Sequence, residues 1–236
     1  MKRNILFATL AVLTGSLVAA NAAPKDDVMA AAKKLADQSN YSWKSTVDVA
    51  GGQGGRMGGP TEGKTEKGGL TWLSMTRGEN TMVAVLKGDK GALKTQDGWQ
   101  SVSEAAADDQ GPGRWLGRML QTFKAPAAQA EDVAGKTKEL KKDGDAIASD
   151  LTEDGAKSLL TMGGRAGGNT PEISDAKGSV KFWIKDGVLH KWELKVKGKV
   201  SFNGNDREVD RTTTVEIKDI GSTKIEVPEE AQKKLS

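Results

Sequence analysis

Residues 188–202 read Val-Leu-His-Lys-Trp-Glu-Leu-Lys-Val-Lys-Gly-Lys-Val-Ser-Phe, and this stretch decides the fold. Its even-numbered positions are apolar or small apart from His190, whereas its odd-numbered positions are mainly lysines. Successive side chains of a β-strand point to opposite faces, so the pattern predicts one strand with a dry face and a wet face. The stretch is much longer than the usual strand of about five or six residues, and long twisted strands curl. We therefore expect a sheet that bends around whatever covers its dry face.

The segment that follows, residues 209–218, alternates in the same way and predicts an antiparallel partner. Matching the two dry faces requires an even-length turn inside 203–208, and it also brings opposite charges together on the wet face. The predicted pairs are Phe202 with Val209, Val196 with Val215, Leu194 with Ile217, Lys195 with Glu216, and Glu193 with Lys218. This register places Arg211 on the dry parity opposite Val200, where it either snorkels outward or contacts a ligand.

The segment before the long strand predicts a hairpin that turns near Asp186-Gly187. A two-residue loop at that dipeptide would place Phe182 against Lys191. A three-residue loop, Lys185-Asp186-Gly187 with a glycine bulge, would instead pair Phe182 with His190 and Val180 with Trp192. The three-residue loop is preferred because it matches apolar residues on one face.

The rest of the chain predicts shorter strands and helices. Asp26 and Asp27 are candidate N-caps of a first helix, and Thr152 is a candidate cap of a later one. Helices are expected at 26–38, 114–123, 127–133 and 152–162, and strands at 41–49, 70–76, 81–87, 92–95, from Trp99, 136–140, 147–151 and 225–227. The predicted class is α+β and mainly β: a long-stranded, curved antiparallel half-barrel with short helices on its concave face.

The first 22 residues are predicted to be a secretory signal. Lys2-Arg3 gives a basic start, an apolar run follows, and Ala20-Asn21-Ala22 is the small-x-small pattern cleaved by signal peptidase. The alternative is a permanent membrane anchor, but the run is short for a spanning helix of about 20 residues, and Gly15-Ser16 interrupts it. Cleavage after Ala22 would leave 23–236 as a single periplasmic or secreted domain without a transmembrane segment.

Two glycine-rich segments, at about 51–69 and 163–171, predict loops rather than core. Neither contains the Lys-Ser/Thr pair of a phosphate-binding loop. The chain has no cysteine, which excludes zinc–thiolate sites, cysteine nucleophiles and the acylated cysteine of a bacterial lipoprotein. Acidic and basic residues are interspersed and the net charge is +3, so we expect no nucleic-acid partner. Because the sequence shows no phosphate loop and no metal-ligand motif, we also expect no cofactor.

Catalytic motifs are absent from the sequence. His190 is the single histidine, and it has no second histidine or cysteine with which to share a metal. Metalloprotease and Ser-His-Asp signatures are also missing. A packed or hydrogen-bonded core histidine is the preferred interpretation, and we predict that the protein is not an enzyme, with an unrecognised hydrolase as the less favoured alternative.

Tryptophan is unusually prominent, with six residues against one tyrosine and four phenylalanines. Ordinary core filling and the lining of a ligand cavity both explain such residues on strands and on an apolar helix stripe. If a cavity exists, its candidate lining residues are Trp43, Trp72, Trp115, Met119, Phe182, Trp192, Leu194, Val196 and Arg211.

Residues 178–194 contain an apolar strand, the Asp186-Gly187 turn and the start of the long strand. Thr214-Val-Glu-Ile-Lys-Asp-Ile-Gly221 and Ile225-Glu-Val-Pro228 then end the domain. This ending resembles that of the bacterial periplasmic lipoprotein-carrier superfamily, the LolA-like proteins and the mycobacterial LppX/LprG group. The opening at 26–49, a helix followed by a strand, is also similar.

The resemblance implies an open half-barrel, helices that plug its concave face, and a cavity for acyl chains. Members of this superfamily carry lipoproteins, glycolipids or other lipids across the aqueous envelope, and this chain would be a non-lipidated member. We therefore expect an exported protein that binds an apolar small molecule or lipid as a carrier or chaperone. The alternative is a solid-core module that binds envelope proteins through its surface and glycine-rich loops.

Overall fold

The computed structural model describes residues 23–50, 59–108, 113–161, 171–202 and 204–235. The predicted signal, most of the second glycine-rich segment and part of the first lie outside these residues. Among the helices of the described ranges, none combines the length and apolar character needed to cross a membrane.

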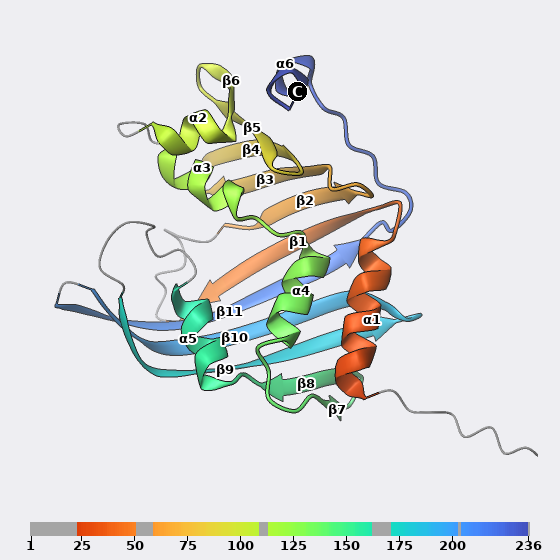
Figure 1. The fold of residues 1–236 in the computed structure, drawn as a ribbon, viewed down its shortest axis with the longest axis vertical. Helices are drawn as coiled ribbons and strands as arrows, with labels where there is room; N and C mark the ends of the chain where they lie inside the picture. Colours follow the sequence, from red (N-terminus) through yellow and green to blue (C-terminus); the bar gives the residue numbers. More distant parts are fainter. Residues whose placement is uncertain (1–22, 51–58, 109–112, 162–170, 203, 236) are drawn as a thin grey trace, which may run out of the picture.

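Eleven strands form one antiparallel sheet in the order β6-β5-β4-β3-β2-β1-β11-β10-β9-β8-β7 (Figure 1). The sheet is curved and unclosed, with β6 and β7 as its two edges. The strands are β1 Asn40–Val49, β2 Thr61–Glu66, β3 Thr71–Arg77, β4 Asn80–Lys87, β5 Lys90–Thr95, β6 Gly98–Ser101, β7 Lys141–Asp143, β8 Ala146–Asp150, β9 Glu172–Lys185, β10 Val188–Phe202 and β11 Asn205–Lys218. The predicted fold class is confirmed.

Six short helices accompany the sheet in the described residues. They are α1 Pro24–Ala36, α2 Val102–Ala107, α3 Arg114–Gln121, α4 Pro126–Ala134, α5 Glu153–Thr161 and α6 Glu229–Lys234. Helices α1 and α5 pack on β9 and β10, α4 packs beside α1, and α2 and α3 pack on β5 (Figure 1). We call the face under α1–α5 the concave face and the opposite one the convex face.

The ends of two helices test the predicted caps. The Thr152 hydroxyl accepts a hydrogen bond from the Gly155 amide at 3.0 Å, as expected at the start of α5. Helix α1 instead begins with Pro24, and its N-cap makes no side-chain hydrogen bond. Asp26 and Asp27 therefore lie in the first turn, where carboxylates favour the positive end of the helix dipole, and they are not caps.

The predicted register between β10 and β11 is wrong by four residues. Phe202 pairs with Asn205, which leaves a two-residue loop containing Gly204 at a φ of +76°. Such a loop suits the right-handed twist of a hairpin. Because the error is even, every side chain keeps its predicted face. The observed pairs include Val196 with Arg211, Leu194 with Thr213, Trp192 with Val215, Lys195 with Thr212 and Glu193 with Thr214.

The preferred loop between β9 and β10 is also wrong. Asp186 and Gly187 both have positive φ angles, +54° and +73°, and form the two-residue loop that was the alternative. A register irregularity follows at His190, so Phe182 pairs with Trp192 and Val180 with Leu194. The irregularity puts Leu189 in the core and leaves His190 half-buried, which corrects its predicted place on the dry face.

Three further predictions need correction. Residues 61–66 are strand β2 within the predicted loop 51–69. The hairpin of β7 and β8 turns at Gly144-Asp145 and not at the predicted Asp143-Gly144. Its first strand lies after the predicted 136–140, its second is shifted by one residue from the predicted 147–151, and Thr137 and Leu151 form a separate single bridge. Residues 225–227 are irregular and not a strand.

The segment after β11 crosses to the convex face and explains why residues 70–76 are apolar on both sides. The Thr223 amide donates to Asn40 Oδ1 at 2.7 Å, and the Ile225 amide donates to Glu66 Oε1 at 3.0 Å. Helix α6 then packs on β5 and β6. Consequently Val85, which points away from the core, is fully buried.

Candidate functional site

The concave face is covered unequally along its length. We call one part the covered end; its residues are nearly inaccessible and lie beneath α1 and α4. It comprises Tyr41, Trp43, Phe182, Trp192, Val215 and Ile217. We call the other part the Arg211 end; its side chains are half-buried, and α5 is the described helix nearest to it. It comprises Val47, Val49, Val209, Arg211 and Thr213.

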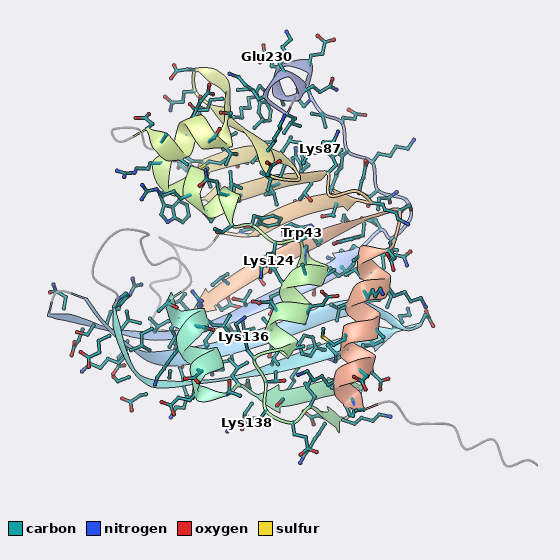
Figure 2. The ribbon with its side chains drawn as sticks, viewed as in Figure 1. Trp43, Lys87, Lys124, Lys136, Lys138 and Glu230 are labelled. Carbon is teal, nitrogen blue, oxygen red and sulfur yellow. The ribbon has the colours of Figure 1, made fainter. Side chains whose placement is uncertain are left out.

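Trp43 is held tightly within the covered end. Its indole Nε1 donates to Thr65 Oγ1 at 3.2 Å, and its ring stacks on Phe123 with 6.0 Å between centroids. Opposite it on β2 is Gly63, where an added Cβ would overlap the indole ring. Glycine is thus required at this position for the indole to lie against the sheet. Trp43 lies on β1 near the start of α4 (Figure 2).

Tyr41 is two residues before Trp43 on the same face and is 2% exposed. Burial raises the pKa of its phenol to about 12, although hydrogen bonding to Thr65 and to the backbone of Ala127 opposes the shift. The covered end is therefore dry enough to disfavour a charge.

Arg211 occupies the other part of the face. It pairs across the sheet with Val49 on β1 and Val196 on β10, so directly paired apolar side chains flank it on both sides. Its guanidinium Nη2 donates to the Leu159 carbonyl of α5 at 2.7 Å. Burial lowers the pKa of the guanidinium below its usual value.

Two buried donors on the concave face lack acceptors among the described residues. They are Nε of Arg211 and the indole Nε1 of Trp192. Native proteins pair most buried polar atoms, so both are candidates for contact with a ligand.

The predicted lining residues divide into two groups. Trp43, Phe182, Trp192, Leu194 and Val196 are buried on the concave face, and Met119 of α3 is half-buried against the same core. Trp72 instead points to the convex face, where Lys64 Nζ lies 5.8 Å from its ring centroid. Trp115, predicted on the apolar side of its helix, is 45% exposed.

Sequence reasoning missed several residues that shape this face. Thr65 lies in the segment 51–69 that was predicted to be a loop. Phe123, the last residue of the predicted helix 114–123, lies beyond the end of α3 and stacks on Trp43. Val47 and Val49 belong to the predicted dry face of their strand, so their alternation was a usable signal. Thr213 lies opposite Leu194, where the predicted register placed Ile217.

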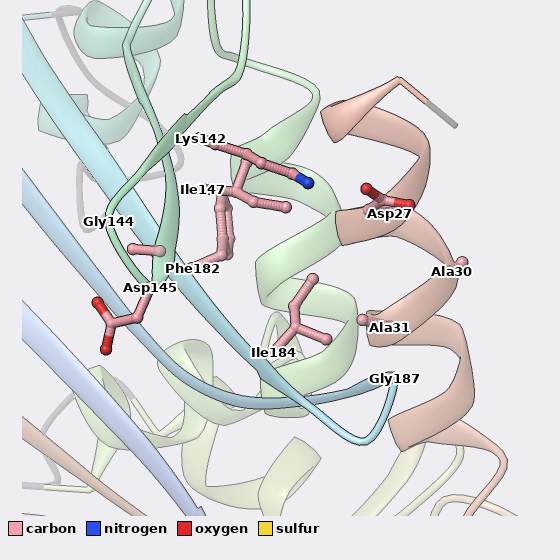
Figure 3. A pocket seen from close by; sticks show the side chains of 11 residues that line it. Asp27, Ala30, Ala31, Lys142, Gly144, Asp145, Ile147, Phe182, Ile184 and Gly187 are labelled. Atoms are coloured by element: carbon pink, nitrogen blue, oxygen red, sulfur yellow. The ribbon is translucent and has the colours of Figure 1, made fainter. Parts of the chain in front are cut away.

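A pocket of about 410 Å³ lies between α1, the β7–β8 hairpin and the β9–β10 turn (Figure 3). Apolar side chains, among them Ile147, Phe182 and Ile184, line it, and Asp27, Lys142 and Asp145 contribute charged groups. The pocket lies next to the covered end, since Phe182 belongs to both. In the described residues no three His, Asp or Glu side chains are placed to hold a metal ion.

The protein thus has the architecture of an open antiparallel sheet with helices across its concave face. No protein-family profile and no curated protein sequence matches the chain. Solved structures with a similar arrangement include LprF from Mycobacterium bovis, which is 10% identical with a TM-score of 0.46 and aligns over 88% of this chain and 97% of its own.

Two further solved structures are similar. The lipoprotein LppX from Mycobacterium tuberculosis is 10% identical over 86% of this chain and 97% of its own, with a TM-score of 0.46. A LolA-superfamily protein from Nitrosomonas europaea is 8% identical over 87% of this chain and 96% of its own, with a TM-score of 0.34.

Proposed function

We propose that this protein is an exported, non-enzymatic carrier that holds an apolar chain between its helices and the concave face of its sheet. The observation that supports the proposal most is the row Tyr41, Trp43, Ser45, Val47 and Val49 on β1. This row passes from nearly inaccessible to half-buried side chains while remaining mostly apolar. A half-buried apolar surface that continues a core is suited to receive an apolar ligand.

Protein side chains fill the covered end beneath α1 and α4, so the ligand is expected to enter at the Arg211 end, where α5 is the nearest described helix. A chain that enters there must displace α5. Helix α5 buries Leu159 together with the small residues Gly155 and Ala156. Exposing one leucine costs about 1.5–3 kcal/mol, whereas a long acyl chain that leaves water gains about 0.8 kcal/mol per CH₂. The gain from a chain of twelve or more carbons exceeds the loss.

The test is binding of dodecanol, a neutral twelve-carbon amphiphile, to the purified protein. We expect dodecanol to raise the melting temperature and to remain bound in native mass spectrometry. Val47→Glu, which adds a charge to the concave face, should abolish both effects. Thr46→Glu is the matched control, because Thr46 is the adjacent residue on the opposite face. A wild-type protein that binds neither dodecanol nor any lipid from an envelope extract would contradict the proposal.

Export has a separate test. Protein recovered from the periplasm or the medium should begin at Ala23. An uncleaved N-terminus in a membrane fraction would instead support the anchor.

The filled covered end favours a second candidate, a solid-core module whose partners are envelope proteins. Pull-down from envelope fractions distinguishes the two functions: the module should retain its partner when Val47 is replaced by glutamate, and the carrier should lose its ligand.

A further inference from the structure

The cations of β10 and β11 have different partners on the two faces of the sheet. On the convex face Lys195 lies 3.8 Å from Asp210, and Lys199 lies 2.6 Å from Asp206. On the concave face Arg211 has no carboxylate within ion-pair distance among the described residues, and its guanidinium donates instead to the Leu159 carbonyl.

The guanidinium has more donors than the protein uses. A guanidinium carries five N–H groups in a planar fork that matches a carboxylate or a phosphate. One bond to Leu159 uses part of this capacity, and the buried Nε has no acceptor among the described residues. A buried cation without an acidic partner is unfavourable unless something else supplies the acceptor.

The residues around Arg211 are apolar. This is the arrangement expected where the charged head group of an amphiphile meets its apolar chain. Val49 and Val196 flank it, and Leu160 of α5 packs close to Gly198 on the same strand as Val196. Trp192, whose indole is the second unpaired donor, pairs across the sheet with Val215. Val215 lies four residues after Arg211 on β11. This separation is about 13 Å along the strand, and it leads directly into the apolar covered end.

We infer that Arg211 is the head-group site for an anionic amphiphile, whose carboxylate or phosphate binds the guanidinium while its acyl chain extends toward Trp192. This inference rests on the proposed carrier function and specifies its ligand class. The unpaired Nε and the remaining guanidinium N–H groups supply the donors for a bidentate contact.

Arg211 also has a structural role. Leu159 lies in the last turn of α5, and a cation there favours the negative end of the helix dipole. A purely structural arginine would affect the stability of the fold but not the choice between charged and neutral ligands. The test must therefore measure how much more tightly the protein binds a charged ligand than a neutral one.

The experiment compares dodecanoate with dodecanol, which share a chain length and differ in head-group charge. Affinities are measured by calorimetry at neutral pH, below the aggregation concentration of each ligand. We expect the wild-type protein to bind dodecanoate at least about tenfold more tightly, as charge-assisted bonds to a guanidinium imply. Arg211→Gln should remove this preference and retain the binding of dodecanol. Lys195→Gln, which removes a convex cation, should leave the preference unchanged.

Each other outcome has a defined meaning. Equal affinity of the wild-type protein for the two ligands overturns the head-group site and leaves the carrier intact, whereas binding of neither ligand overturns the carrier itself. If Arg211→Gln does not fold, Arg211→Lys keeps the charge without the fork and should retain a reduced preference; a full preference there contradicts the bidentate contact. Acetate and inorganic phosphate serve as anions without an acyl chain. If either binds as tightly as dodecanoate, the acyl chain contributes nothing and the inference that the ligand is an amphiphile is overturned. Lauroyl lysophosphatidic acid tests the phosphate head group and should match or exceed dodecanoate.

Discussion

The covered end and the Arg211 end share strands β1 and β11, yet the helices cover them to different degrees. At the covered end, α1 and α4 exclude water, and the side chains interlock as Trp43 does with Gly63 and Phe123. At the Arg211 end, half-buried valines surround a cation that no described acid neutralises. The helices thus close one end of the sheet more completely than the other, and we propose that the less covered end receives the ligand.

The largest effect should come from removing the ring at the centre of the covered end. Phe182 is fully buried, so Phe182→Ala should lower the free energy of unfolding by about 3–5 kcal/mol through lost burial and a cavity. Phe123→Ala is the matched substitution at a half-buried position and should cost roughly half as much. Chemical denaturation measures both values. Equal losses of unfolding free energy would show that the side chains around Phe182 are packed no more tightly than those around Phe123.

The dryness of the covered end should appear as a pH dependence. The raised pKa of Tyr41 means that its protonated form is favoured in the folded state, so its contribution is fully present below about pH 10. As the pH rises from 10 to 12, the unfolded chain releases its proton first and stability falls by roughly 2–3 kcal/mol. Tyr41→Phe should lose less stability over this window. Parallel curves for the two proteins would contradict the buried phenol.

A matched pair of valines compares the two ends directly. Val215→Ala at the covered end should lower the free energy of unfolding by about 2 kcal/mol, because two methyl groups leave a closed core. Val47→Ala at the Arg211 end should cost about 1 kcal/mol or less. Thermal unfolding without ligand measures the stability loss of each variant. A larger loss for Val47→Ala than for Val215→Ala would contradict the assignment of the closed core to the covered end.

The smallest effect should occur at the exposed indole. Trp115 is 45% exposed on α3, so Trp115→Ala should change stability by no more than about 0.5 kcal/mol. Its fluorescence should also be quenched by iodide far more readily than that of Trp43. A loss as large as that of Phe182→Ala would mean that Trp115 contributes to the core.

Much of the fold could be predicted because strand alternation is a local signal. Trp192, Leu194 and Val196 were assigned to the dry face from spacing alone, and they are buried. The irregularity at His190 could not be predicted, because it depends on how the two-residue loop before it joins the neighbouring strand. The pairing of β10 with β11 was missed for a related reason: an even shift leaves every face unchanged, so the apolar pattern cannot detect it.

The candidate site was only partly predictable. Spacing places Trp72 and Trp43 equally well in a core, but Trp72 lies on the convex face next to Lys64. The covering of that face depends on the chain after β11, more than a hundred residues later. Arg211 was recognised as a charge on the dry parity, while its contact with Leu159 depends on the position of α5.

The sequence by itself determined that residues 188–202 and 209–218 form strands, which face of each is dry, and that the two are antiparallel, since these follow from side-chain period and turn chemistry between neighbours in the chain. Only the tertiary structure decided the register, the choice of tryptophans for the core, and the place of Arg211 between two valines and the end of α5. These features arise from contacts between segments far apart in sequence, where several pairings satisfy the same local pattern and close packing selects among them.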